Sequence, residues 1–138
     1  MDDTFRLQII TPERSFLDAD ATMLVVLAED GEIGIAAGHT AMLISTVAGE
    51  IRIQQGGLWR VAAASDGIVT VTPGQVVFLL QTCEWPEEID ENRARRDEEH
   101  ALEVLRQKGS MQEYVLAKSM LSRAMVRLRV VRGASNND

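Results

Sequence analysis

Few residues in this sequence combine the type and spacing that catalysis needs. The two histidines, His39 and His100, lie far apart, and the single cysteine, Cys83, cannot by itself form an internal disulfide or a thiolate metal site. Ser65 and Asp66 are residue types of Ser-His-Asp triads, but their spacing from His39 matches no triad pattern, and we interpret them as turn residues. We therefore expect neither an enzyme active site nor a metal centre.

The most unusual segment is the glycine-rich run 31–39, GEIGIAAGH, which holds three glycines in nine residues. It matches neither a P-loop nor the glycine-rich turn that opens a nucleotide-binding helix after a strand. By itself the run indicates a strand bounded by close backbone approaches or by positive φ angles.

The elements that would position these residues form two parts. In the first part, short β-rich runs alternate with turn signals such as Asp66-Gly67 and Pro73-Gly74. Strands are predicted at 6–10, 14–18, 22–27, 32–35, 42–45, 49–54, 58–64, 68–71 and 75–81. Continuous apolar runs at 23–27 and 76–80 favour strands covered on both faces. The pattern predicts an N-terminal antiparallel β-sandwich of about ten short strands over residues 1–86.

After Pro86 the composition changes to one dense in helix formers. A first helix is predicted to begin at Glu87, with Gly109 as its C-terminal cap, and Ser110 is predicted to cap a second helix over 111–131. The second helix carries an apolar stripe of Tyr114, Ala117, Leu121, Ala124, Leu128 and Val131, and the first a weaker stripe of Ala94, Ala101, Leu102 and Leu105. A connection this short predicts a C-terminal antiparallel α-helical hairpin, residues 87–138.

Composition and charge exclude several classes of protein. The 138 residues are 46% hydrophobic, and no apolar run approaches the roughly 20 residues of a membrane span, so a soluble chain is expected. The acidic start, Met1 to Asp3, predicts no secretory signal, and the lone cysteine fits a reducing interior. The net charge of −7 argues against nucleic acid as a partner.

The charges are unevenly distributed along the chain. Residues 109–132 hold one acid, Glu113, and five bases, whereas residues 87–108 are rich in acids. Burial of an alanine-rich seam between the two helices stabilises the hairpin by only about a few kcal/mol. One interpretation is therefore that the hairpin is a switch with two docked states. The other is that it is an ordinary solvated helical hairpin.

The order of these parts, with 31–35 (GEIGI), Gly38-His39 and 51–53 (IRI), resembles the epsilon subunit of F-type ATP synthases over nearly the whole chain. Where the family usually has a larger apolar residue and a proline before the Gly-His pair, this chain has Ala36 and Ala37, which indicates a divergent member. The resemblance implies a non-catalytic rotor subunit of the central stalk, which couples rotation of the c-ring, driven by protons or sodium ions, to ATP synthesis.

The partners implied by this resemblance are the gamma subunit, the c-ring and the alpha/beta catalytic head, with no nucleic acid and no insertion into the membrane. Glu32 and His39 fall where the sandwich would contact the c-ring and gamma. The implied location is the cytoplasmic face of the bacterial inner membrane, as a peripheral protein. The C-terminal helices are expected to be mobile and to inhibit ATP hydrolysis when extended, and Arg123, Arg127 and Arg129 form a basic cluster suited to acidic surfaces of the head.

A second match lies inside the hairpin, where residues 89–94 (IDENRA) fit the Ile/Leu-Asp-x-x-Arg-Ala motif with which some bacterial epsilon subunits bind ATP. The implied site consists of Ile89, Asp90, Arg93, Ala94, Arg123 and Arg127. No cofactor is expected to be required, and ATP is expected as a regulatory ligand. One departure is His100, where ATP-binding members carry a further arginine. Asp90 and Arg93 also serve as cap and salt-bridge partners in members that do not bind nucleotide appreciably.

Two other functions stay open at this point. One is a free ATP-binding sensor, which would be stabilised by ATP without any other subunit. The other is a β-sandwich adaptor that is not part of an ATPase, for which the run 31–39 would be an incidental loop.

Overall fold

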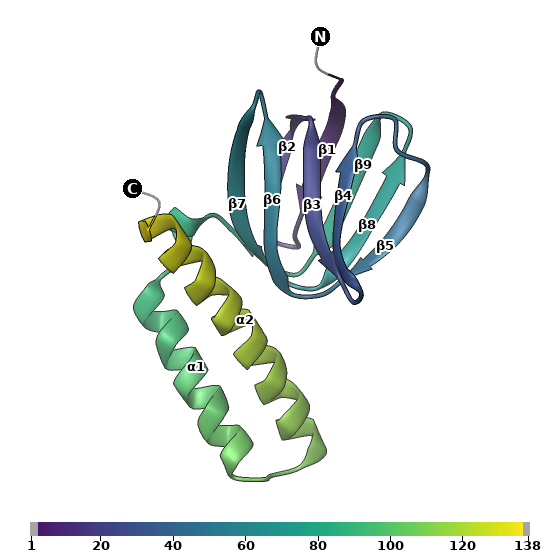
Figure 1. Cartoon of the computed structure of the whole chain (residues 1–138). Helices are drawn as coiled ribbons and strands as arrows, with labels where there is room; N and C mark the ends of the chain where they lie inside the picture. Colours follow the sequence, from purple (N-terminus) through teal and green to yellow (C-terminus); the bar gives the residue numbers. More distant parts are fainter. Residues whose placement is uncertain (1–2, 137–138) are drawn as a thin grey trace. The chain divides into compact units, whose positions relative to one another are not determined.

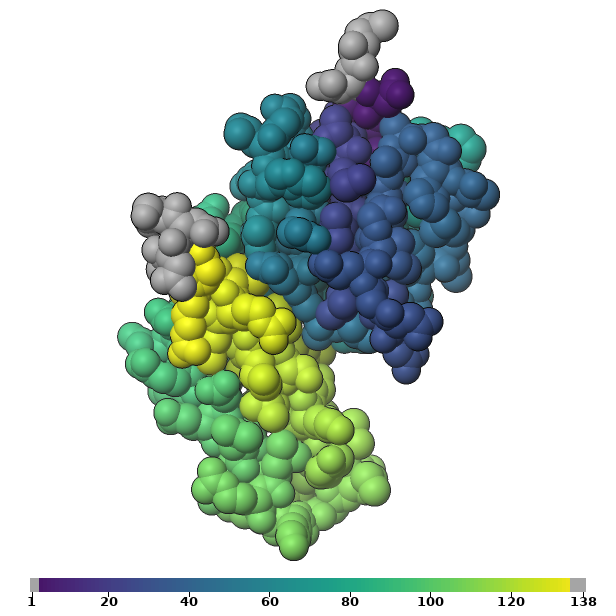
Figure 2. Space-filling model, in the orientation of Figure 1, coloured from purple at the N-terminus to yellow at the C-terminus, as the bar shows by residue number. Residues whose placement is uncertain are grey.

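The computed structural model describes residues 3–136 and places ten strands before two helices (Figure 1). Met1 and Asp2 of the acidic start, and residues 137 and 138 at the end of the predicted second domain, lie outside the described residues. The chain divides into two compact units, Met1–Glu84 and Trp85–Asp138, whose surfaces can be followed by colour in Figure 2.

The first unit is a β-sandwich, which confirms the predicted fold class. Its strands are β1 (Phe5–Ile10), β2 (Ser15–Ala21), β3 (Met23–Ala28), β4 (Gly31–Ala36), β5 (Met42–Thr46), β6 (Gly49–Gln55), β7 (Leu58–Ala64), β8 (Gly67–Thr72), β9 (Gln75–Leu80) and β10 (Cys83–Glu84). One layer has the order β10-β7-β6-β3-β4 and the other β5-β8-β9-β1-β2. A single pair, Ala28 opposite Thr46, links β3 to β5 and makes the two layers continuous.

One pairing among the described strands departs from the antiparallel prediction, because β1 and β9 run parallel. Leu7 lies opposite Val76 and Ile9 opposite Phe78. Neighbouring strands joined by a tight hairpin must be antiparallel, but β1 and β9 are far apart in the sequence and no hairpin constrains their direction. These four side chains are buried in the core between the layers.

Ser65 has a structural role, in agreement with its interpretation as a turn residue. Its side chain is buried between β7 and β8, and its Oγ accepts hydrogen bonds from the backbone N–H groups of Gln81 (3.1 Å) and Thr82 (2.9 Å). The hydroxyl in turn donates to the Asp66 carbonyl oxygen at 3.3 Å. The hydroxyl therefore satisfies two backbone donors of another segment, which explains a polar residue inside this core.

The second unit is the predicted helical hairpin, with a later start. Pro86–Glu88 form a single 3₁₀ turn, η1, and α1 runs over Glu91–Arg106 rather than from Glu87. Asp90 is the N-cap of α1, since its carboxylate accepts a hydrogen bond from the backbone N–H of Arg93 at 3.1 Å. Ile89, between the turn and this cap, is extended and interrupts the helix-forming run.

The connection between the helices differs in part from the prediction. Ser110 caps α2 (Met111–Asn136) as predicted, because its hydroxyl accepts from the backbone N–H of Glu113 at 3.1 Å. Gly109 is not the left-handed residue that ends α1; that residue is Lys108, with a φ of 52°. A Cβ atom at Gly109 would lie 2.5 Å from a carboxylate oxygen of Glu113, so glycine leaves room for this carboxylate, which accepts a hydrogen bond from the Ser110 hydroxyl at 3.3 Å.

The seam between α1 and α2 consists mainly of alanine. Ala94 and Ala101 of α1 are buried, as are Ala117, Ala124 and Leu128 of α2. The predicted stripes include two residues that the structure places outside the seam, Leu102 and Tyr114, both of which are exposed. Leu102 directly follows Ala101, so it lies about 100° further around α1, away from the partner helix.

Candidate functional site

Glu32 and His39, the predicted contact residues, lie on and just after β4. Glu32 is exposed near the start of β4, and one of its carboxylate oxygens accepts a hydrogen bond from the Arg52 guanidinium at 3.0 Å. His39 follows Gly38, whose φ is 79°, and its Nδ1 lies 3.3 Å from the Thr40 carbonyl oxygen. An extended strand separates Glu32 from the end of β4 by about 13 Å, so the two side chains are separate contact points and not one cluster.

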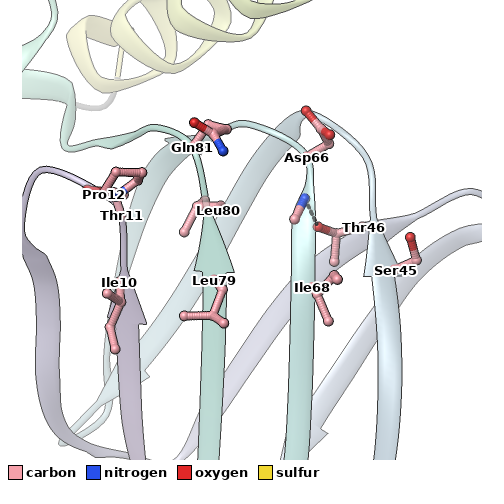
Figure 3. Close-up of a pocket in the computed structure, with 11 residues that line it drawn as sticks. Ile10, Thr11, Pro12, Ser45, Thr46, Asp66, Ile68, Leu79, Leu80 and Gln81 are labelled. Carbon is pink, nitrogen blue, oxygen red and sulfur yellow. Dashed lines mark hydrogen bonds between the residues drawn. The ribbon is translucent and has the colours of Figure 1, made fainter.

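A row of apolar side chains on the outer face of the other layer, two of them exposed and one half-buried, was missed by the sequence analysis. Ile10, Leu79 and Ile68 lie side by side on β1, β9 and β8, because Leu79 pairs with both of the others (Figure 3). The Leu79 side chain is 51% exposed and that of Ile68 48%. These three residues, called the apolar row, line an open pocket of about 590 Å³ that Asp66 and Gln81 also border.

The signal for the apolar row was present in the sequence. The run 76–80 was interpreted as a strand covered on both faces, yet within the described structure the outward face at Leu79 is open. An apolar residue at such a position indicates a surface that another protein covers.

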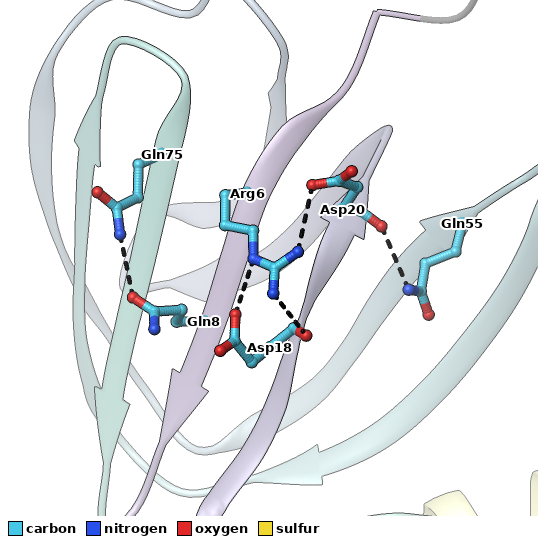
Figure 4. A network of polar contacts seen from close by, with 6 residues as sticks. All are labelled: Arg6, Gln8, Asp18, Asp20, Gln55 and Gln75. Carbon is cyan, nitrogen blue, oxygen red and sulfur yellow. Dashed lines mark hydrogen bonds and ion pairs between the residues drawn. The ribbon is translucent and has the colours of Figure 1, made fainter.

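The outer face of this same layer is polar at its other end. The Arg6 guanidinium on β1 donates to the Asp18 carboxylate at 2.8 Å and lies 3.6 Å from the Asp20 carboxylate, while Gln75 donates to Gln8 at 3.0 Å (Figure 4). The hydrogen bond to Asp18 raises the pKa of the Arg6 guanidinium. These polar side chains already form hydrogen bonds and ion pairs with one another. The apolar row is therefore the end of this face that is suited to bind another protein.

The motif residues of the hairpin have different environments. Asp90 uses one carboxylate oxygen to cap α1, and Arg93 is exposed on the first turn. Ala94 is 2% exposed because it packs in the helix seam, so it offers no open surface to a nucleotide ring in this structure. Ile89 is half-buried in the extended link before the cap.

The register of the hairpin shows which arginines share a side. Glu91 of α1 and Arg132 of α2 form an ion pair at 3.5 Å, and Glu98, Arg129 and Arg132 line a pocket of about 480 Å³. These residues define one flank of the hairpin, called the Glu91 flank. Since an α-helix turns about 100° per residue, Arg93, Arg123 and Arg127 lie on the opposite flank, called the Arg93 flank.

Arg123 carries an unusual polar group. Its Nε is buried and has no hydrogen-bond partner within the part of the chain that the structure describes. A buried donor without an acceptor is costly, so a group able to accept a hydrogen bond would be stabilised there. The structure therefore brings the predicted arginines to one flank and leaves one donor available.

The first turns of α2 are apolar around most of their circumference. Tyr114, Val115 and Leu116 are consecutive and all exposed, with Leu116 at 70%, and Met111 is exposed at 75%. A helix that packs against only one neighbour needs one apolar stripe. The additional apolar surface indicates that α2 has a second packing partner.

Residues 3–136 contain no helix that is long and apolar enough to cross a membrane. The same described residues hold no group of three His, Cys, Asp or Glu side chains that could bind a metal ion. Cys83 is buried, and its carbonyl oxygen accepts a hydrogen bond from the Arg14 guanidinium at 3.1 Å.

A β-sandwich with an uncovered apolar row, joined to a separate hairpin with excess apolar surface, is the architecture of a protein that works by binding other proteins. The chain belongs to the delta/epsilon chain family of ATP synthase. Residues 4–86 match the family model described as the beta-sandwich domain of the ATP synthase delta/epsilon chain, and residues 87–132 match the model of its long alpha-helix domain.

Relatives agree with this membership, and a solved structure has the same fold. The chain is 42% identical to the ATP synthase epsilon chain of Caldicellulosiruptor saccharolyticus over 97% of its own length and 98% of the relative's. It is 40% identical to that of Caldanaerobacter subterraneus, covering 94% and 95%. A chain in the cryo-EM structure of the Euglena gracilis mitochondrial ATP synthase has the same fold, with a TM-score of 0.77, 19% identity, and coverage of 95% of this chain and 81% of that one.

Proposed function

We propose that the chain is a non-catalytic rotor subunit of the central stalk of an F-type ATP synthase. The observation that carries this proposal is the apolar row on the outer face of the sandwich, which fits a permanent protein neighbour. Family membership favours the gamma subunit as that neighbour and leaves the adaptor outside any ATPase without support.

The coupling role follows from how the sandwich is built. Ten hydrogen-bonded strands around one core, in which Phe78, Leu7 and Ile9 are fully buried, form a stiff body able to pass a torque between neighbours. We infer that the c-ring contacts the β4 side, where Glu32 and His39 provide separate polar contacts. Rim contacts of this kind fix register more than they add affinity. The subunit would then lie at the cytoplasmic face of the bacterial inner membrane, as a peripheral protein.

A charge placed in the apolar row tests the contact with gamma. Leu79→Asp is expected to weaken the binding of the purified chain to gamma by at least about tenfold, because a carboxylate would be buried at the interface without a partner. Binding is measured by titration and by co-purification with gamma.

The matched control for this variant is Thr72→Asp, which places the same charge on the same outer face, four residues further along β8 from Ile68 and opposite Gln75. It is expected to bind gamma nearly as tightly as the natural chain. Equal binding of gamma by the Leu79 variant and the natural chain would exclude the apolar row as the contact. If the natural chain itself does not bind gamma, the proposed function is wrong.

We propose that the hairpin inhibits ATP hydrolysis by leaving its compact arrangement and packing against the catalytic head. Two features support this role. The alanine-lined seam between α1 and α2 buries little apolar area, so the cost of rearranging it is small. The exposed apolar start of α2 gives the rearranged helix a surface with which to bind a second partner.

ATP binding is the second function that a particular observation favours. The Arg93 flank gathers three guanidinium groups, and the buried Arg123 Nε lacks an acceptor that a phosphate oxygen would supply. We propose that ATP binds along this flank and holds the hairpin compact, which makes ATP a regulator and not a required cofactor. Asp90 has one carboxylate oxygen engaged in the cap and a second that is able to accept from the adenine amino group.

A thermal titration of the isolated chain checks this site. ATP at about 100 times its dissociation constant is expected to stabilise the compact form by about 2.7 kcal/mol. The double variant Arg123→Ala, Arg127→Ala is expected to lose this rise in melting temperature. The control is Arg129→Ala, Arg132→Ala, which removes the same charge from the Glu91 flank and is expected to keep most of the rise. An equal loss in both variants would mean that the stabilisation by ATP depends only on the net charge of the chain, and that ATP has no site on the Arg93 flank.

A further inference from the structure

We propose that the pocket at the apolar row binds a lysine or arginine side chain of the gamma subunit, and that the cationic group of this side chain pairs with Asp66. The inference rests on the proposed function, in which gamma covers the apolar row. It goes beyond that function because it names the kind of side chain that the pocket receives and the residue that selects it.

The pocket combines an apolar wall with a charged end. The apolar row forms the wall, and Asp66 lies just before the start of β8, at one end of the pocket (Figure 3). Of the eleven described residues that line the pocket, Asp66 alone has a charged side chain. A side chain that fills this pocket therefore needs apolar surface along its length and a positive group at one end.

The carboxylate of Asp66 is available to such a positive group. Asp66 is exposed, and within residues 3–136 its carboxylate forms no hydrogen bond or ion pair. The carboxylates of Asp18 and Glu32, elsewhere on the sandwich, are already bound by arginines. A cation from a partner would therefore form a charge-assisted hydrogen bond with Asp66 without displacing an existing one.

Hydrogen bonds on both sides hold the backbone that carries Asp66. The buried Ser65 hydroxyl, which accepts from the N–H groups of Gln81 and Thr82, donates to the Asp66 carbonyl oxygen at 3.3 Å. The N–H of Gly67, the next residue, donates to the Thr46 hydroxyl at 2.9 Å. Because this backbone is already ordered, binding of a partner at Asp66 costs little further conformational entropy.

The distance between Asp66 and the apolar row suits a long side chain. Asp66 precedes Ile68 by two residues, which corresponds to about 7 Å along an extended segment. Lysine and arginine lay their apolar stems on such a surface while their charged ends reach a polar group. A shorter apolar side chain would cover Leu79 and leave the Asp66 carboxylate at the interface without a partner. A carboxylate introduced at Leu79 would face the apolar stem and not the cation, in agreement with the loss expected of Leu79→Asp.

The charge of the sandwich as a whole also favours a basic partner. Residues 1–84 contain 11 acidic and 4 basic residues. Two of these basic residues, Arg6 and Arg52, are paired with acids of the sandwich itself. The excess of negative charge attracts a partner that presents basic groups, and an acid at the contact fixes the register of that partner.

Removal of the charge at Asp66 tests the proposal. Asp66→Asn keeps the size of the side chain and is expected to weaken gamma binding about tenfold, because the cation of the partner would be buried without its counter-charge. Asp66→Lys is expected to weaken binding about a hundredfold, because two cations would then face each other. Asp66→Glu restores the charge and is expected to retain most of the affinity. All affinities are measured by titration of gamma with the purified chains.

The matched control is Glu50→Gln, which removes the same charge from β6 in the other layer of the sandwich. It is expected to bind gamma as the natural chain does. Unchanged binding by a folded Asp66→Asn chain would overturn the inference. An equal loss in Asp66→Asn and Glu50→Gln would also overturn it, since only the net charge of the sandwich would then matter.

Chemical labelling of carboxylates in the natural chain gives a measurement that needs no variant. A carbodiimide with a small amine is expected to label Asp66 at least about tenfold more slowly in the complex with gamma than in the isolated chain. Glu50 is expected to be labelled at the same rate in both. Equal labelling of Asp66 in both states would overturn the inference even if the Asp66→Asn chain does not fold. Failure of the natural chain to bind gamma would instead contradict the proposed function.

Discussion

Ending the chain at Glu84 is expected to raise ATP hydrolysis by the assembled enzyme about tenfold, if the inhibited state normally holds nine-tenths of the molecules. The truncation removes the whole second unit, Trp85–Asp138, including the exposed apolar surface of α2 that we propose as the inhibitory contact. The measurement is the hydrolysis rate of ATP synthase reassembled with either chain, at equal occupancy of the subunit.

The core of the sandwich lies within the retained unit, so this truncated chain is expected to fold and to bind gamma as the full chain does. Gamma binding is therefore the control, since a truncated chain that fails to bind would raise hydrolysis for another reason. An unchanged hydrolysis rate with normal gamma binding would contradict the inhibitory role of the hairpin.

Replacing Gly67 by alanine is expected to destabilise the sandwich by about 3 kcal/mol or more. A Cβ atom there would overlap the carbonyl oxygen of Leu79 and lie 2.8 Å from the Leu80 Cβ, so β8 and β9 would have to separate. The Gly67 N–H also donates to the buried Thr46 hydroxyl at 2.9 Å, a bond that the shift would strain. Chemical unfolding of the isolated chain measures the loss, which corresponds to a fall in melting temperature of about 10 °C.

The matched control for this variant is Gly34→Ala, because Gly34 is also a strand glycine without a positive φ but has open space above it. Its free energy of unfolding is expected to change by less than about 1 kcal/mol. A similar loss in both variants would mean that strand glycines matter here through backbone entropy and not through the close approach of β8 to β9.

The strands were predictable where turn residues bound them. Asp66-Gly67 and Pro73-Gly74 separate β7, β8 and β9 much as predicted. The second strand was predicted at 14–18, whereas β2 runs over Ser15–Ala21. The side chains of Asp18 and Asp20, in its second half, face outward and are bound by Arg6. β10 was missed because two residues are too few to show an alternating pattern.

The hairpin was predictable from its stripes, but its start was not. The acids after Pro86 resemble a helix N-terminus, and only the capping bond of Asp90 to the Arg93 N–H shows where α1 begins. Prediction of the apolar row would have required knowledge of the strand pairing. Ile10, Ile68 and Leu79 are brought together by strand register and not by their spacing in the sequence. The grouping of Arg93 with Arg123 and Arg127 likewise needed the register that the Glu91–Arg132 pair reveals.

The two-residue strand β10 has a mechanical consequence. It is the final strand of the sandwich, and it is held by pairs with Ala63 and Ala64 and by the hydrogen bond from Arg14 to the Cys83 carbonyl oxygen. A force applied through the helices would act on these few hydrogen bonds one after another, beginning at Glu84. The segment that links the sandwich to a moving hairpin would then lengthen under tension. Its length would depend on the strength of the hydrogen bond from Arg14 to the Cys83 carbonyl oxygen.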